Sequence, residues 1–221
     1  MEVIVIFTIA EALTLLATDD EKGTAKVTSS VQYGLSGAAI AELLYKGKLA
    51  IEKKKVIVKD DSLTDISFFN TIIEEIKEAK AKKVEHWIRY FSSKKERLID
   101  PLYLSLVEKG ILKEEEKTNF LIFSRTVYPT LDERAEVEIR KQVNDVVLNG
   151  KERDGEVEIL LSLIKASSLI NEVFGKENKK EAKQFIKEIE KENELAKLIS
   201  KAISNVESED MATISTTVIN N

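Results

Sequence analysis

The sequence has no cysteine and a single histidine, His86, among its 221 residues. Without cysteine there can be no disulfide bond, no thiolate metal ligand and no cysteine nucleophile, which suits a reducing cytoplasm. One histidine with no cysteine to accompany it is too little for a zinc site, so we expect no metal. Only eight glycines and two prolines interrupt the chain, and long helices can therefore form.

Long apolar runs are also missing. The chain opens with the five-residue run VIVIF and has no basic residue before it, which is too short for a signal peptide or a membrane span. A spanning helix needs about 18 consecutive apolar residues, and no segment of the sequence reaches that length. We therefore expect a soluble, cytoplasmic protein whose contact with membranes is peripheral.

Acidic residues outnumber basic ones, but the charges are unevenly distributed. The chain is 43% apolar and 33% charged, with a net charge of −5, which is typical of a folded, helix-rich protein. Residues 46–97, the basic half, contain 14 Lys and Arg against 9 Asp and Glu, a local charge of +5. Such a segment can attract anionic head groups or nucleic acid, although the same lysines could simply solvate helix faces and ribbon edges.

Apolar periodicity and capping residues predict a mainly α-helical fold. Thr8 and Glu11 form a capping box, and the helix that they open is expected to end near Gly23. A second helix is predicted from Leu35 to Lys46. Two further helix starts are predicted from the capping boxes Ser62 with Asp65 and Thr130 with Glu133.

The amphipathic pattern of the last helix ends at Val206. Its apolar residues are three and four apart from Leu195 onward, which indicates one buried face. The residues after Val206 are polar and show no such spacing. We therefore expect a single helical domain over residues 1–206 and a poorly patterned C-terminal tail over residues 207–221.

One pattern occurs twice in the chain. The segments AELLYKGKLAIEKKKVIVKD and LYLSLVEKGILKEEEKTNFLIFS each contain an apolar helix, a Lys-Gly pair, a short strand, a charged turn and an apolar strand. A helix followed by a two-stranded ribbon resembles a winged-helix unit. We therefore expect a helical bundle decorated with two small β-hairpins, although a shared Lys-Gly stop signal could also produce the likeness by coincidence.

Nothing in the sequence predicts catalysis. The segment Gly34-Leu35-Ser36-Gly37 is not a nucleophile elbow, because G-x-S-x-G has its second glycine one residue later. We interpret the two glycines as allowing a loop and a helix start to approach a neighbouring backbone or a ligand, with Ser36 as a cap. No phosphate-binding or dinucleotide-binding glycine motif occurs. We expect no catalytic residue and no cofactor.

Six segments of the chain carry a more specific signal. They are LTLLATDDEKG, GLSGAAIAELLYKGKL, VIVKDDSLTD, VEHWIRYFS, LVEKGILKEEEKTNFLIF and YPTLD. Each is weak alone, but together and in this order they resemble the Golgi phosphoprotein 3 family over roughly residues 9–174. The resemblance implies a mainly helical bundle with small hairpins. It also implies a peripheral membrane protein that binds phosphatidylinositol 4-phosphate and links Golgi enzymes to vesicle coats, as eukaryotic members do.

The chain departs from the resemblance at the lipid pocket. Eukaryotic members place an Arg between the two glycines, a Trp shortly before it and two Arg ahead of the helix that ends in LVEKG. This chain has Ser36, Val27, Glu96 and Ile99 at those positions. The candidate lipid-binding residues are therefore Lys26, Ser36, Lys94, Lys95 and Arg97. A solvated face would account for these cations equally well.

Two functional hypotheses follow. The first is a non-enzymatic adaptor, cytoplasmic and peripheral to membranes (to the Golgi if the protein is eukaryotic), that binds anionic lipid through the basic half and a cargo or coat protein elsewhere. The alternative is a protein-interaction scaffold without a lipid role. We expect no nucleic-acid partner. Because Phe120, Leu121, Ile122 and Phe123 are consecutive in the predicted second strand, we expect the hairpin over residues 111–123 to promote homo-oligomer formation or docking, which the resemblance also implies.

Overall fold

The computed structural model describes residues 7–19, 24–25, 28–119 and 123–219. Its helices are α1 (Ile9–Ala17), α2 (Ser29–Tyr45), α3 (Ser67–Glu78), α4 (Val84–Ser92), α5 (Ile99–Glu108), α6 (Arg134–Asn149), α7 (Gly155–Ala166), α8 (Ile170–Glu192) and α9 (Glu194–Ile219), with a 3-10 turn η1 (Lys95–Arg97) between α4 and α5. Its strands are β1 (Thr18–Asp19), β2 (Thr24–Ala25), β3 (Leu49–Glu52), β4 (Lys55–Val58), β5 (Glu115–Asn119) and β6 (Phe123–Val127).

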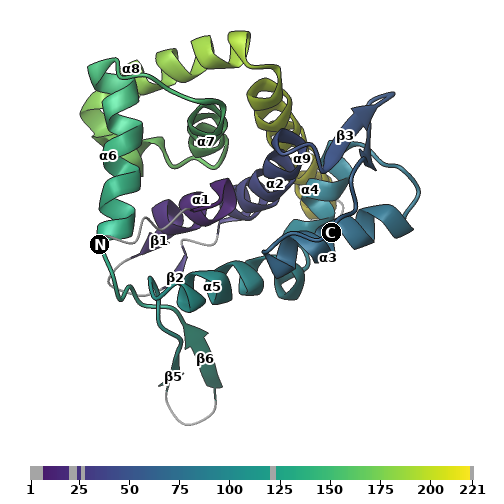
Figure 1. Cartoon of the computed structure of the whole chain (residues 1–221), viewed down its shortest axis with the longest axis horizontal. Helices are drawn as coiled ribbons and strands as arrows, with labels where there is room; N and C mark the ends of the chain where they lie inside the picture. Colours follow the sequence, from purple (N-terminus) through teal and green to yellow (C-terminus); the bar gives the residue numbers. More distant parts are fainter. Residues whose placement is uncertain (1–6, 20–23, 26–27, 120–122, 220–221) are drawn as a thin grey trace.

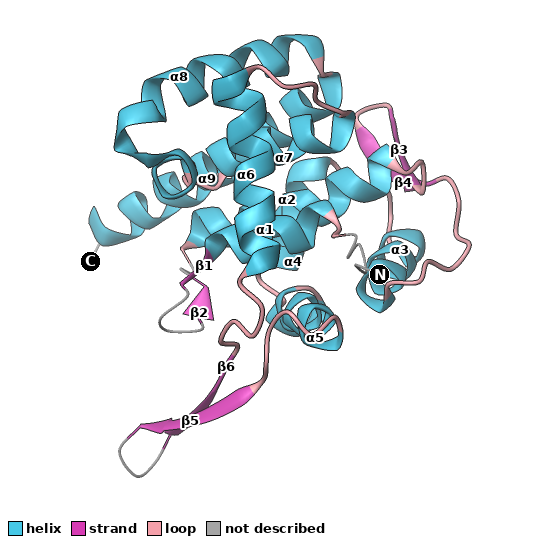
Figure 2. Ribbon diagram, turned by 60° about the vertical axis from the view of Figure 1, so that its left-hand side comes forward, coloured by secondary structure: helices cyan, strands magenta, loops and turns pink. Residues whose placement is uncertain are grey.

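The predicted helical bundle with small hairpins is confirmed. The strands within the described residues form three separate antiparallel pairs, β1 with β2, β3 with β4 and β5 with β6. The last two pairs follow α2 and α5 as the repeated pattern predicts, whereas β1–β2 is a two-residue pair that the sequence did not reveal. Figure 2 shows β5–β6 projecting away from the helices. Among the described residues, no helix is both long enough and apolar enough to cross a membrane.

Helix α2 lies at the centre of the bundle. It packs against α1, α4, α7 and α9 (Figure 1), and its residues from Tyr33 to Leu43 are buried. This burial on all sides explains why its apolar residues form no single stripe. Helix α3 buries one apolar face, which consists of Phe68, Phe69, Ile72, Ile73 and Ile76.

The predicted start of α2 at Leu35 is wrong. The helix begins at Ser29, and the side chain of Thr28 accepts a hydrogen bond from the Val31 N–H at 3.3 Å. Gly34, Ser36 and Gly37 therefore lie inside the helix, and Ser36 does not cap it. The glycines instead allow close packing of neighbouring helices. A Cβ at Gly34 would overlap the Ser167 Oγ, and one at Gly37 would lie 2.8 Å from the Ile203 Cδ1.

Other predicted helix boundaries are also wrong. Helix α1 ends at Ala17 rather than near Gly23, because Thr18 and Asp19 enter β1. Helices α3 and α6 begin without a side-chain cap, several residues after Ser62 and one residue after Glu133 respectively. Among the three predicted capping boxes, that of Thr8 and Glu11 is confirmed.

The C-terminal residues differ from the predicted tail. Helix α9 continues past Val206 to Ile219. Arg89 of α4 donates to Asp210 through Nε at 3.0 Å and to Glu209 through Nη2 at 2.8 Å, while the Tyr33 hydroxyl donates to Asp210 at 2.6 Å. Side-chain hydrogen bonds and ion pairs hold this extension, so its sequence does not need the apolar spacing of a helix that is held by a buried face.

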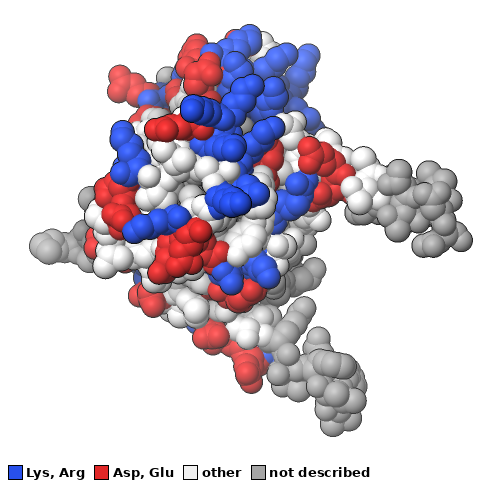
Figure 3. Space-filling view, turned by 90° about the vertical axis from the view of Figure 1, so that its right-hand side faces the viewer, with Lys and Arg blue, Asp and Glu red and all other residues white. Residues whose placement is uncertain are grey.

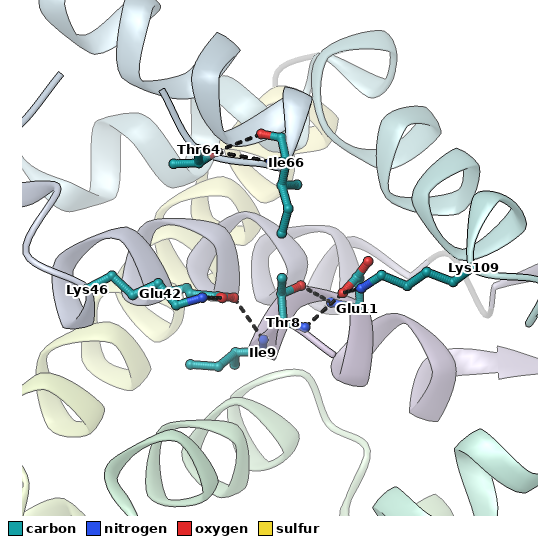
Figure 4. Close-up of polar contacts among 8 residues, drawn as sticks. All are labelled: Thr8, Ile9, Glu11, Glu42, Lys46, Thr64, Ile66 and Lys109. Carbon is teal, nitrogen blue, oxygen red and sulfur yellow. Dashed lines mark hydrogen bonds and ion pairs between the residues drawn. The ribbon is translucent and has the colours of Figure 1, made fainter. Parts of the chain in front are cut away.

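Two buried carboxylates, those of Glu11 and Glu42, hold the N-terminus of α1 (Figure 4). They also position the β3–β4 and β5–β6 ribbons. Glu42 is 1% exposed and accepts from the Ile9 N–H at 2.8 Å and from the Lys46 Nζ at 2.6 Å. Burial raises the pKa of Glu42, and the hydrogen bond from Lys46 opposes that rise. A buried carboxylate is costly without such partners. Lys46 compensates the charge of Glu42 at the end of α2, and the hydrogen bond from the Ile9 N–H to Glu42 holds that end beside α1.

Glu11 anchors the helix end that precedes the β5–β6 ribbon in the same way. It is fully buried and accepts from the Thr8 N–H at 2.8 Å, the Ser105 hydroxyl at 2.7 Å and the Lys109 Nζ at 2.6 Å. Lys46 and Lys109 are the lysines of the two repeated Lys-Gly pairs. The glycines that follow them have φ values of 71° and 72°, in the left-handed conformation that ends a helix.

We predict that Gly34→Ala destabilises the protein by about 1–3 kcal/mol, because its Cβ must displace Ser167. The Ser167 Oγ has no hydrogen-bond partner among the described residues, so Ser167→Gly can make room without removing one. The double variant should therefore recover most of the lost stability in urea unfolding. A Gly34→Ala protein that is more stable than wild type, as helix propensity alone would make it by about 1 kcal/mol, would contradict this packing.

Candidate functional site

The structure does not assemble the five candidate lipid-binding residues into one site. Lys26 lies outside the described residues, as does Val27. Ser36 is completely buried in α2 and donates to the Gln32 carbonyl oxygen at 2.9 Å, so a head group cannot reach it. Lys94 lies between α4 and η1, and Lys95 is the first residue of η1.

Arg97 is reachable by solvent, but its charge is already compensated. Its side chain is 40% exposed and forms an ion pair with Glu75 of α3. Glu75 also accepts from the Tyr90 hydroxyl at 2.6 Å. The hollow beside Arg97 is further lined by Glu74 and Glu78. A phosphate would meet three carboxylates around one arginine, an environment that repels anions.

Several other cations of the basic half are paired as well. Lys48 bonds to Asp60 at 2.9 Å and lowers the pKa of that carboxyl to about 2. Lys77 bonds to Asp61 at 2.6 Å and lowers its pKa too. Lys46 and Arg89 are paired within the bundle, as described above. Ion pairs inside residues 46–97 leave the net excess of positive charge unchanged, whereas Lys46 and Arg89 pair with carboxylates outside the segment, Glu42, Glu209 and Asp210.

A group of lysines in the basic half remains without an ion pair in the part of the chain that the structure describes. We call this group the lysine surface. All of its members are exposed. They are Lys53, Lys54, Lys55 and Lys59 of the β3–β4 ribbon and Lys80, Lys82 and Lys83 between α3 and α4.

One backbone contact brings the two parts of the lysine surface together. The Val56 N–H donates to the Lys82 carbonyl oxygen at 2.8 Å in an antiparallel bridge, so residues 80–83 run beside β4. The positive charge also affects His86. Burial makes the largest contribution to lowering the pKa of His86, and Lys82 and Arg89 lower it further. Figure 3 views the side on which Figure 1 places β3, and Lys and Arg dominate the upper part of that face, which includes the end of the molecule along which α8 runs in Figure 1.

The sequence contained the signal for this surface. The run Lys53-Lys54-Lys55 and the segment Ala79–Lys83 are both lysine-rich, but only the bridge between Val56 and Lys82 shows that they are neighbours. The family resemblance points instead to cations that are close in sequence to Ser36 and Glu96. One of these cations, Arg97, is paired with Glu75 in the structure.

The predicted self-association strand is shifted. Phe120, Leu121 and Ile122 lie outside the described residues, and Phe123 begins β6. Glu115 and Glu116 belong to β5 rather than to a charged turn, which is a correction. The base of this ribbon packs against α5, where Tyr128 stacks on Tyr103 with ring centroids 4.6 Å apart. Within the described residues, no group of three or more acidic or histidine side chains could hold a metal ion.

Comparisons with known proteins agree with this architecture. A family model described as Golgi phosphoprotein 3 matches residues 9–206. The chain is also similar to vacuolar protein sorting-associated protein 74 of Schizosaccharomyces pombe, with 28% identity over 162 residues. That match covers 63% of this chain and 48% of the relative, so the chain spans about half of the relative's length. The family assignment made from the six segments is confirmed.

We predict that vesicles carrying phosphatidylinositol 4-phosphate bind no more than about twofold better than phosphatidylserine vesicles of equal charge. The positions that would supply converging arginines hold a buried serine, a glutamate and an isoleucine, so bidentate contacts that discriminate the phosphate position are missing. Ser36→Ala should leave binding unchanged in the same co-sedimentation assay. A large preference for the phosphoinositide that Ser36→Ala abolishes would show that this region is a pocket after all.

Proposed function

Because the chain belongs to the Golgi phosphoprotein 3 family, we propose that it is a non-enzymatic adaptor that binds peripherally to membranes. It binds anionic head groups through its basic half and presents other surfaces to protein partners. Its place is the cytoplasmic face of a membrane, which in a eukaryotic cell is that of the Golgi. The observation that carries the lipid-binding part is the lysine surface, where exposed cations gather without an ion pair to any described carboxylate.

The physical basis of this proposal is the field of an anionic bilayer. A lysine near such a surface contributes about 1 kcal/mol, and the contributions of several lysines on one face accumulate. Paired cations such as Lys48 and Arg97 contribute less, because a neighbouring carboxylate is repelled as the cation is attracted. A group of unpaired lysines on one side of the molecule therefore favours membrane contact over a uniformly solvated surface.

We predict binding to phosphatidylserine vesicles that is moderate in strength and strongly dependent on salt. Raising the ionic strength from about 0.01 M to about 0.1 M shortens the screening length from about 30 Å to about 10 Å, so the bound fraction in co-sedimentation should fall steeply. Neutral phosphatidylcholine vesicles are the control and should bind little protein at any salt concentration. Absence of binding even at low salt, or binding that salt does not change, contradicts the proposal.

The β5–β6 ribbon supports a role in protein interaction. This role is compatible both with the adaptor and with the alternative function, a scaffold that does not bind lipid. It projects from the bundle in a different direction from β3–β4 (Figures 1 and 2). A projecting two-stranded ribbon has open strand edges, which are sites for pairing with another chain. Its partner would be a second copy of this protein, or a cargo or coat protein.

We predict that shortening this ribbon converts an oligomer into a monomer. Glu115 and Val127 lie opposite each other in the ladder, so an Asn-Gly turn can replace residues 116–126 without disturbing the base. Sedimentation should then report the monomer mass, while helical circular dichroism should match that of the wild type. A wild-type protein that is already monomeric at high concentration, or a shortened protein with an unchanged mass, would show that the ribbon does not mediate self-association.

A further inference from the structure

The backbone at the tip of the β3–β4 ribbon is unusual. Glu52 and Lys55 pair across the ladder, and the two residues between them form the turn. Lys53 has a φ of 47° and Lys54 a φ of 63°, so both are left-handed, as in a type I′ turn. Such a turn normally contains Asn-Gly or another sequence with glycine or asparagine at these positions.

Lysine is poorly suited to this conformation. A residue with a Cβ is destabilised in the left-handed region, because its Cβ lies too close to the following carbonyl oxygen. Two consecutive lysines adopt this conformation here. Backbone strain of this kind is found preferentially where a side chain is needed for function. The side chains of Lys53 and Lys54 make no ion pair within the described residues, so no intramolecular salt bridge explains why lysine is present at the tip.

The surroundings of the tip indicate what the lysines meet. Lys55 and Lys59 continue the positive charge along β4, and Lys82 and Lys83 continue it beside the ribbon. Ile51, opposite Val56 in the ladder, is 37% exposed, whereas Val56 is fully buried. The ribbon thus presents cations with a partly exposed apolar side chain among them. This combination is complementary to the head-group region of an anionic bilayer.

We propose that the tip of the β3–β4 ribbon is the point at which this protein touches an anionic bilayer. The contact recognises the density of negative charge rather than one head group, because flexible lysine side chains act as point charges without a fixed fork geometry. This inference rests on the proposed function and adds the location of the contact. It also explains why strained lysines are present where asparagine and glycine would be more stable.

The test uses the double variant Lys53→Asn/Lys54→Gly. Relief of strain should raise its thermal unfolding midpoint by roughly 2–4 °C. Loss of the two charges should reduce partitioning onto phosphatidylserine vesicles by about 30-fold, or about fivefold per lysine. The two effects have opposite signs, so a loss of binding cannot be attributed to unfolding. Lys53→Arg/Lys54→Arg should retain binding.

The matched control removes the same charge elsewhere. Lys179 and Lys180 are exposed and belong to α8, which runs along the top of the molecule in Figure 1, whereas β3 lies at its right. Lys179→Gln/Lys180→Gln should change partitioning less than threefold, about a tenth of the effect at the tip. Two results would overturn this inference and leave the proposed function standing. In the first, the control variant loses as much binding as the tip variant. In the second, the wild type binds the vesicles well and the tip variant binds them equally well. Wild-type protein that ignores the vesicles overturns the proposed function with it.

Discussion

The burial of two carboxylates at the N-terminus of α1 is the constraint on which the rest of the structure depends. Glu11 and Glu42 are almost completely inaccessible to solvent, so each needs a cation and hydrogen-bond donors close by. Lys109 and Lys46 supply the cations, and the first N–H groups of α1 supply further donors. Each lysine ends the helix of one helix–ribbon unit. The two similar segments of the sequence therefore meet at the same helix end, and both ribbons start from fixed positions.

These anchors determine which cations are available to a ligand. Lys46 and Lys109 are committed to the interior, and Arg89 and Arg97 are paired with carboxylates of α9 and α3. In the basic half, the exposed lysines that have no ion pair among the described residues lie on the β3–β4 ribbon and on the segment bridged to it. Because β5–β6 leaves the bundle in another direction (Figure 2), contact of β3–β4 with a bilayer leaves β5–β6 accessible to a protein. One molecule can in this way meet a membrane and a partner together, as an adaptor must.

The helical class and much of the core could be predicted from the sequence, because apolar spacing directly reflects burial on one helix face. The Trp87 face of α4 and the Phe68 face of α3 are examples. Helix α2 was harder, since it is buried on all sides and contains two glycines that indicate a loop. Those glycines are needed for contacts with Ser167 and Ile203, which are distant in the sequence. The continuation of α9 depends on partners in α2 and α4 and is equally invisible to local patterns.

The candidate site could be predicted only in part, for a similar reason. The excess of lysine in residues 46–97 was evident, but pairing depends on neighbours such as Glu75 and Glu209 that only the fold brings close. The family resemblance points to Ser36, which is buried. A run of lysines in the sequence becomes a surface only when a second segment lies beside it, and that required the bridge between Val56 and Lys82.

Hydrogen–deuterium exchange of the wild-type protein, with and without phosphatidylserine vesicles at low salt, measures most directly where the membrane contact lies. We expect the vesicles to slow exchange at the amides of residues 51–59 and 80–83, and high salt to reverse that protection. Exchange in α8 and in β5–β6 should remain as in the free protein. Protection confined to β5–β6, or to the end of α4 and η1, with none at the β3–β4 ribbon, would contradict the assignment of the lysine surface as the membrane-binding face.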